Sequence, residues 1–203
     1  MTRIIAGNLR GRAIKVPDAV TRPTTSRVRE AVLSSVQHAV SGFDDLRVLD
    51  LYAGSGAFGI EAMSRGAHEA VFVEKDRKAA DVIKSNLAEL KIARATVTAQ
   101  DVSVFLGTPT GVGAFDVVFS DAPYDVEDSA IDAQLTHLVT HGFLNDGAVV
   151  LIERGKNSAI TWPAEFSDHK SRRYGDTLVE IARYDRAIET DSPESSDTES
   201  EQT

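Results

Sequence analysis

Short apolar runs alternate with longer segments of helical periodicity between residues 46 and 153. A short continuous apolar run is typical of a buried strand, whereas apolar residues three or four positions apart indicate one face of a helix. The pattern predicts strands at 46–52, 70–74, 96–100, 115–120 and 148–153, helices at 57–65, 76–90 and 128–141, and a short turn near 102–106. Strands that alternate with helices favour an α/β fold with a mostly parallel sheet covered on both faces.

Both ends of the chain depart from this alternation. Near the N-terminus, apolar segments at 4–6 and 13–16 flank the stretch GNLRGR and predict a small hairpin. Helical spacing then predicts a helix over 22–40, with a capping residue among 24–26. The segment 169–184 predicts two strands joined by a tight turn. A terminal hairpin added to a parallel sheet implies an antiparallel strand.

The composition fits one domain of ordinary size. A length of 203 residues with 42% hydrophobic residues allows a sizeable core, and the absence of cysteine rules out disulfides and thiolate metal sites. The chain shows neither a transmembrane run nor a secretory signal. We therefore expect a cytoplasmic monomer with no membrane and no metal partner. The expected organisation is a basic hairpin and helix extension at 1–40, a main domain at 41–186 and a disordered acidic tail at 187–203.

Charge is distributed unevenly along the chain. The formal net charge is −9, yet residues 1–30 hold seven Lys/Arg against two acids, whereas 187–203 hold six acids and no base. A basic arm on an acidic protein indicates contact with nucleic-acid phosphates. The candidates are Arg3, Arg10, Arg12, Lys15, Arg22, Arg27 and Arg29. The alternative, that Arg27 and Arg29 pair with Glu30 or other acids, stays open.

The stretch DLYAGSGAFG, residues 50–59, follows the first predicted strand. Gly54, Gly56 and Gly59 match G-x-G-x-x-G, the pattern of dinucleotide-binding loops. A carboxylate at Asp50 would repel a pyrophosphate but suits the cationic ammonium and sulfonium of S-adenosylmethionine. The loop therefore favours S-adenosylmethionine as the ligand. A role for Asp50 in only capping or orienting the loop stays open.

Two further acids follow the next strands. Glu74 ends the second predicted strand, where a carboxylate can accept both ribose hydroxyls of an adenosine cofactor. Asp101 follows the third, where it can accept from the adenine amine beside Val102, or cap the following turn, or do both. The predicted cofactor-binding residues are Asp50, Tyr52, Ala53, Gly54, Ser55, Gly56, Gly59, Glu74, Lys75, Asp101 and Val102.

Asp121–Tyr124, the predicted catalytic residues, end the fourth predicted strand, which is expected beside the first. Their sequence, D-A-P-Y, resembles the Asp/Asn-Pro-Pro-Tyr/Phe motif of amino-methyltransferases. Asp121 and the Ala122 carbonyl would accept the two N–H groups of an exocyclic base amine. Pro123 would stiffen the loop, and Tyr124 would stack on the base. Ala122 stands where the motif has its first proline, so the loop lacks one conformational restraint.

The match extends over about residues 3–185. The stretches RIIAGNLRGRAIKVP, RPTTSRVREAVLSSV, DLYAGSGAFGIEAMSRGA, VEKDRKAADVIKSNL, SDAPY and RRYGDTLVEIARY together resemble the bacterial 16S ribosomal RNA (guanine-N2)-methyltransferase family, RsmD-like. The resemblance implies a class I methyltransferase (Rossmann-like) fold with a seven-stranded sheet and an N-terminal hairpin and helix extension. It also implies S-adenosylmethionine as donor and one guanine of 16S ribosomal RNA in the small subunit as target.

Three other functions remain open from the residues alone. A dinucleotide oxidoreductase would share the glycine loop and Glu74, but it leaves Asp50 and D-A-P-Y unexplained. A DNA or RNA adenine-N6 methyltransferase would use the same amine chemistry, although the short chain lacks an obvious target-recognition domain. A non-catalytic cofactor-binding ribosome assembly factor is compatible with the change at Ala122.

Overall fold

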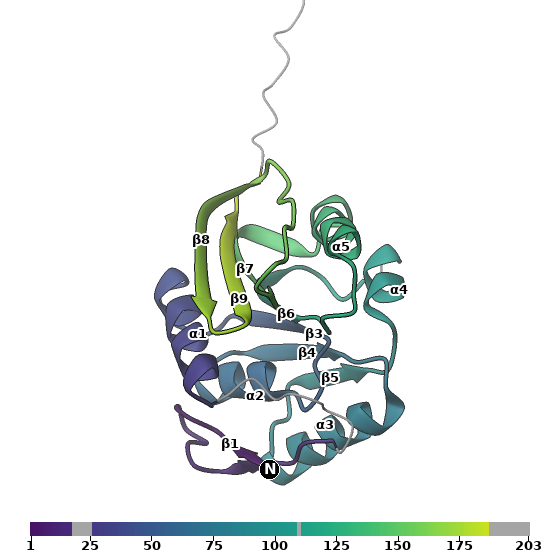
Figure 1. The fold of residues 1–203 in the computed structure, drawn as a ribbon. Coiled ribbons are helices and arrows are strands. Elements are labelled where there is room, and N and C mark those ends of the chain that lie inside the picture. Colours follow the sequence, from purple (N-terminus) through teal and green to yellow (C-terminus); the bar gives the residue numbers. More distant parts are fainter. Residues whose placement is uncertain (18–25, 109–110, 187–203) are drawn as a thin grey trace, which may run out of the picture.

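A seven-stranded sheet forms the centre of the computed structural model, which describes residues 1–17, 26–108 and 111–186 (Figure 1). The strand order is β5-β4-β3-β6-β7-β9-β8. Within this sheet β9 pairs antiparallel with both β7 and β8, and the other pairings are parallel. The strands are β3 (Arg47–Leu51), β4 (Glu69–Val73), β5 (Ala95–Thr98), β6 (Phe115–Asp121), β7 (Leu144–Gly155), β8 (Phe166–Tyr174) and β9 (Thr177–Tyr184). The predicted seven-stranded sheet with a terminal hairpin is confirmed.

Helices cover both faces of this sheet. They are α1 (Ser26–Ala39), α2 (Ala57–Ser64), α3 (Arg77–Leu90), α4 (Val102–Gly107) and α5 (Asp128–Thr140). Because side chains alternate along a strand, Phe119 and Leu151 pack toward α1, α2 and α3, while Val118 and Val150 pack toward α4 and α5. The two apolar layers explain why the central strands read as continuous apolar runs. None of the helices in the described part of the chain is long and apolar enough to cross a membrane.

The N-terminal hairpin is built from strands shorter than expected. Its strands are β1 (Thr2–Arg3) and β2 (Ala13–Ile14), not 4–6 and 13–16. The backbone turns at Gly7, which has a φ of 83°, and a Cβ there would lie 1.8 Å from the Ser64 carbonyl oxygen. The chain leaves the strand early because it must dock against the end of α2. The expected turn at 102–106 is also corrected, since it forms the helix α4.

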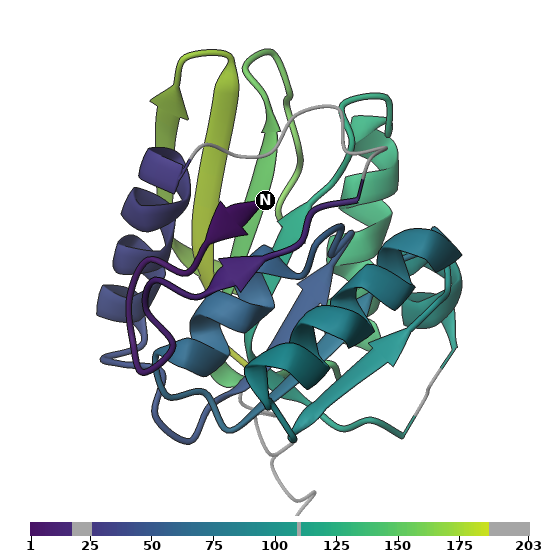
Figure 2. The same cartoon turned by 90° about the horizontal axis from the view of Figure 1, so that it is seen from below.

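The hairpin and α1 belong to the main core. Ile4, Ile14 and Val32 lie in the same apolar cluster as Val117 and Phe119 of the sheet. Figure 2 shows the hairpin lying across α2 and α3. The described residues of the predicted extension, 1–17 and 26–40, therefore pack against the same core as the sheet. The cap predicted for α1 at 24–25 and the predicted tail at 187–203 lie outside the described residues.

Candidate active site

A cavity of about 770 Å³ opens at the carboxyl ends of the central strands. One half lies beside the glycine loop and the end of β4, and the other beside D-A-P-Y and the tip of the β8–β9 hairpin. The predicted cofactor-binding and catalytic residues that line it are Asp50, Tyr52, Ala53, Gly54, Ser55, Glu74, Lys75, Val102, Asp121, Ala122, Pro123 and Tyr124, and Arg29 of the predicted basic arm lines it as well. Gly56, Gly59 and Asp101 are not among the lining residues of the described chain. The structure thus brings the two predicted groups into one cavity.

The three glycines of the loop have different tasks. Gly54 faces the cavity with a φ of 55°, and a Cβ there would meet nothing closer than 3.9 Å. Gly56 begins α2 with a φ of 77°. A Cβ at Gly59 would lie 2.4 Å from the Phe72 ring of β4. Only Gly54 therefore fits the expected close approach to a ligand, whereas Gly59 allows α2 to pack against the sheet.

Two carboxylates, one buried and one partly buried, hold this loop through its backbone amides. Asp50, 2% exposed, accepts a hydrogen bond of 2.9 Å from the Gly59 N–H. Glu74 accepts from the N–H groups of Gly54 and Asp76, both at 2.8 Å. The orienting role that was left open for Asp50 is therefore present in the structure, although the residue also lines the cavity.

Asp50 also has a raised pKa. Burial raises the pKa of its carboxyl well above the usual range, and the Gly59 N–H opposes that shift. The negative charges of Asp121 and Glu74 raise the pKa further. Because Asp121 acts on Asp50 electrostatically, the two halves of the cavity are coupled. A cation placed between these carboxylates would relieve their repulsion.

Asp101 caps α4, as its alternative interpretation predicted. One carboxylate oxygen accepts from the Ser103 N–H at 2.8 Å and from the Ser103 hydroxyl at 2.7 Å. These bonds lower the pKa of Asp101. Val102, directly after it, lines the cavity. Sequence reasoning missed Asp76, which caps α3 through the Ala79 N–H and lines the same half.

The D-A-P-Y loop follows β6, which pairs with β3 as expected. Asp121 is the last residue of β6 and is in register with Glu153 of β7. Tyr124 is 50% exposed at the cavity mouth, and its hydroxyl lies 3.1 Å from the Thr177 hydroxyl on β9. The ring that was predicted to stack on a base is thus held at the rim of the cavity.

Arg154, which the sequence analysis did not single out, holds this loop through hydrogen bonds to its backbone. It is 4% exposed and donates to the carbonyls of Pro123, at 2.9 Å, and Val126. It also forms an ion pair of 3.2 Å with Asp128, whose carboxylate accepts from Ser158 and Ala159 as well. The available signal was a charged pair, Glu153-Arg154, directly after a buried apolar strand.

The expected basic arm is only partly exposed. Arg29 is 2% exposed, donates to the Arg3 carbonyl and lies 3.5 Å from Glu61, so it is an interior cation and not an exposed one. The alternative that Arg29 pairs with an acid is therefore correct, and the acid is Glu61. Lys15 pairs with Glu89 at 3.0 Å.

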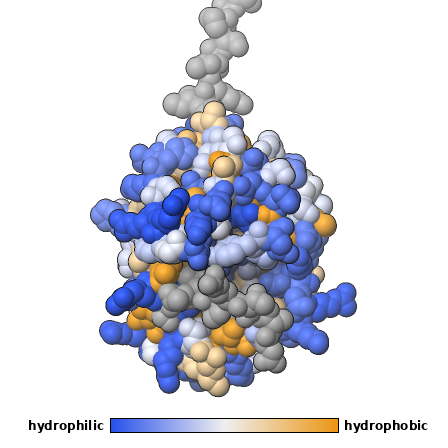
Figure 3. All heavy atoms as spheres, in the orientation of Figure 1, coloured by the Kyte–Doolittle hydropathy of each residue, from blue (hydrophilic) through white to orange (hydrophobic). Residues whose placement is uncertain are grey.

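The remaining cations of the arm differ in their surroundings. Arg3 donates to the Gly11 carbonyl at 2.8 Å and Arg12 to the Glu89 carbonyl at 3.1 Å, while Arg10 and Arg27 are surface residues. Arg22 lies outside the described residues. On the face seen in Figure 3, hydrophobic residues are scattered among hydrophilic ones.

The sheet order, the glycine loop and the acid-rich cavity define a class I methyltransferase fold. The chain belongs to the family described as Conserved hypothetical protein 95, whose model matches residues 2–183. It is 34% identical over 195 residues to ribosomal RNA small subunit methyltransferase D of Escherichia coli K12, covering 94% of this chain and 93% of that protein.

Solved structures agree. The yhhF protein of Escherichia coli superposes with a TM-score of 0.81 at 32% identity, covering 92% of this chain and 99% of that one. Magnesium protoporphyrin IX methyltransferase (ChlM) from Synechocystis PCC 6803, solved with bound SAM, has a TM-score of 0.57 at 16% identity, covering 77% and 79%. The latter likeness is one of fold alone. The fold class and the family indicated by the sequence motifs are confirmed.

Proposed function

We propose that this protein transfers a methyl group from S-adenosylmethionine to the exocyclic N2 of one guanine in 16S ribosomal RNA of the small subunit. The observation that carries the proposal is the single cavity shared by the acid-lined glycine loop and D-A-P-Y. The name of the Escherichia coli relative supports a ribosomal RNA target. A cytoplasmic location and a monomeric state are part of the proposal.

The residues of the glycine-loop half fit S-adenosylmethionine. Asp50 supplies negative charge for its ammonium and sulfonium, and Gly54 leaves room for it beside the backbone. Glu74 binds two backbone amides, yet each carboxylate oxygen keeps a second lone pair for a ribose hydroxyl. When bound, this donor supplies an electrophilic methyl group. A pyrophosphate would instead add negative charge to a pocket in which carboxylates already repel one another.

The other half of the cavity would orient the amine. The Asp121 carboxylate and the Ala122 carbonyl accept its two N–H groups, which frees the nitrogen lone pair from the ring. Tyr124 stacks on the base, an interaction worth about 1–3 kcal/mol. As the N–C bond forms and the S–C bond breaks, the amine loses a proton to water or to Asp121. Orientation of the two reactants can supply about 7–11 kcal/mol, so no strong base is required. The guanine must leave its stack to enter the cavity.

The decisive experiment is methyl transfer from labelled donor to small subunits purified from cells that lack this protein. We expect one methylated guanine, located by mapping the modified RNA. Asp121→Ala should abolish turnover while S-adenosylhomocysteine affinity survives, because the substitution removes the amine acceptor and leaves the Gly54 and Glu74 contacts. Retained turnover in Asp121→Ala would refute the role of that residue.

The same assay separates the competing functions. Label in adenine instead of guanine would identify an adenine-N6 enzyme. Cofactor binding without any transfer would identify an assembly factor. Calorimetric binding of NADH in place of S-adenosylhomocysteine would identify a dinucleotide enzyme.

A further inference from the structure

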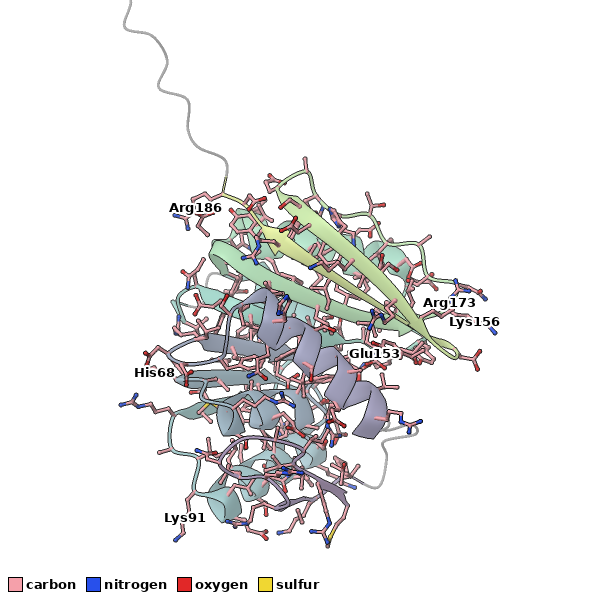
Figure 4. All side chains as sticks on the ribbon, turned by 90° about the vertical axis from the view of Figure 1, so that its left-hand side faces the viewer. His68, Lys91, Glu153, Lys156, Arg173 and Arg186 are labelled. Carbon is pink, nitrogen blue, oxygen red and sulfur yellow. The ribbon has the colours of Figure 1, made fainter. Side chains whose placement is uncertain are left out.

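Three basic side chains lie close, in sequence or in strand register, to residues that line the cavity, on a part of the chain that the sequence did not connect with RNA. We call Lys156, Arg172 and Arg173 the tip surface. Lys156 follows the end of β7, and the two arginines precede the turn between β8 and β9. Figure 4 shows Lys156 and Arg173 together at one end of the hairpin, with Glu153 on the same side of the molecule.

Strand register connects this surface to the cavity. Asp121 pairs with Glu153, Glu153 with Val179, and Val179 with Arg172, so these residues form one row across four strands. Paired residues project from the same face of a sheet, and neighbouring strands lie about 4.8 Å apart. Arg172 therefore stands about three strand spacings, or roughly 15 Å, from Asp121. That span suits a phosphate near a nucleotide whose base enters the cavity.

The residues next to the tip surface belong to the cavity wall. Tyr174 pairs with Thr177 across the turn, and both line the cavity together with Asp176. Arg173, by register with Leu178 and Arg154, projects from the opposite face. The hairpin tip thus carries a basic group on each face while its turn borders the cavity mouth.

Little holds these cations in place within the protein. Lys156 pairs with Asp176 at 2.8 Å, but the side chains are 49% and 60% exposed, and such surface pairs contribute little to stability. Arg173 uses one guanidinium nitrogen on the Lys156 carbonyl at 3.3 Å, which leaves most of its donors available. Both arginines are exposed. By contrast, Arg29 of the N-terminal arm is buried.

We propose that the tip surface binds the RNA phosphates next to the nucleotide that enters the cavity. This proposal rests on the proposed function and specifies where the RNA backbone lies. Phosphate contacts position a nucleic acid and carry no sequence information, so the tip surface would fix the entry point and the cavity would select the base.

The test compares two charge reversals of equal size. Arg172→Glu with Arg173→Glu alters the tip surface, and Lys91→Glu with Arg186→Glu alters exposed cations that Figure 4 places away from it. Binding to small subunits from cells lacking the protein is measured over a series of salt concentrations, with S-adenosylhomocysteine affinity measured on the same preparations. The logarithm of the binding constant falls as the logarithm of the salt concentration rises, and each lost phosphate contact makes this slope shallower by about 1.

For the tip variant we expect weaker binding to the small subunits and a salt slope that is shallower by about 2, with unchanged S-adenosylhomocysteine affinity. We expect the control variant to behave like the wild type in both measurements. An unchanged slope in the tip variant, or an equal fall in both variants, would overturn the proposal. If the tip variant fails to bind S-adenosylhomocysteine, Arg172→Gln with Arg173→Gln decides by the same measurement. The wild type's methyl transfer to these particles is assayed in parallel, and its absence would instead mean that the proposed function has failed.

Discussion

The glycine loop after β3 and the D-A-P-Y loop after β6 lie side by side. Negatively charged side chains hold the glycine loop, whereas a positively charged side chain holds the D-A-P-Y loop. The first loop leads into α2, and N–H groups at a helix start lack partners within the helix. The Asp50 carboxylate accepts from Gly59 in the first turn of α2, and the Glu74 carboxylate accepts from Gly54 in the loop before it. The second loop presents carbonyls, and the guanidinium of Arg154 donates to them. The sign of the supporting charge therefore follows from which backbone groups each loop leaves exposed.

This difference also determines which ligand each side can receive. The carboxylates that hold the glycine loop add negative charge to the donor half, which favours a cationic ligand. The cation that holds D-A-P-Y donates to backbone carbonyls of this loop, where Asp121 is the proposed acceptor for the base amine. Substitutions on the two sides should accordingly separate donor binding from turnover.

Among substitutions of the groups that hold the two loops, the largest effect is expected for Arg154→Met. Removal of the Arg154 guanidinium leaves the Pro123 and Val126 carbonyls without their hydrogen-bond donor. A buried polar group without a partner lowers the free energy of unfolding by about 1–3 kcal/mol. A loop displaced by about 1 Å can lower kcat by about 100-fold. Steady-state kinetics should therefore show a fall in kcat, while calorimetry shows unchanged S-adenosylhomocysteine affinity.

A second substitution tests whether that loss reflects loop position. Ala122→Pro restores the proline of the amino-methyltransferase motif, and we expect it to recover part of the lost kcat when combined with Arg154→Met. A double variant no faster than Arg154→Met would show that Arg154 acts in another way than by holding the loop.

Gly59→Ala should weaken the other side through packing. The added Cβ would lie 2.4 Å from the Phe72 ring, which is fully buried. Overpacking of this kind lowers the free energy of unfolding by about 1–3 kcal/mol, or Tm by roughly 2–12 °C. Thermal unfolding measures the loss, and donor affinity should fall with it.

Gly107→Ala is the matched control for that substitution. A Cβ at Gly107, the last residue of α4, would meet nothing within 4 Å. We expect its Tm to equal or exceed that of the wild type. An equal fall in Tm in both variants would show that the close contact between Gly59 of α2 and Phe72 of β4 does not cause the destabilisation.

The smallest effect is expected for Asp50→Asn, and it depends on pH. Since the folded pKa of Asp50 is raised, the folded protein binds more protons than the unfolded chain, and the free energy of unfolding falls as pH rises from the unfolded value through the folded one. A cationic donor favours the ionised carboxylate, so its affinity should rise with pH over the same window. Asparagine keeps the acceptor for Gly59 but does not titrate.

Calorimetry with S-adenosylmethionine at several pH values measures this effect. We expect Asp50→Asn to weaken binding by about fivefold, or about 1 kcal/mol, and to remove the contribution of Asp50 to the pH dependence. An identical pH profile in the variant would show that Asp50 acts only through its bond to Gly59.

The sequence predicted the elements whose signals are local. The parallel strands are continuous apolar runs, and the glycine loop and D-A-P-Y each occupy a few consecutive residues at strand ends. Arg154 lies 31 residues from Pro123, and the burial of Arg29 depends on Glu61, so no local pattern revealed either role. The glycine pattern could not separate Gly54 from Gly59, because the difference lies in the Phe72 ring of another strand.

One contact also bears on how the chain folds. Arg183 of β9 donates to the carbonyl of Ala39, the last residue of α1, across 144 positions of sequence. The end of the first helix therefore acquires this partner only when the last strand has been made and added to the sheet. Closing so long a loop is slow compared with forming local helices. We expect release of the C-terminal strand from the ribosome, and not synthesis of the glycine loop, to set the moment at which the protein becomes fully structured.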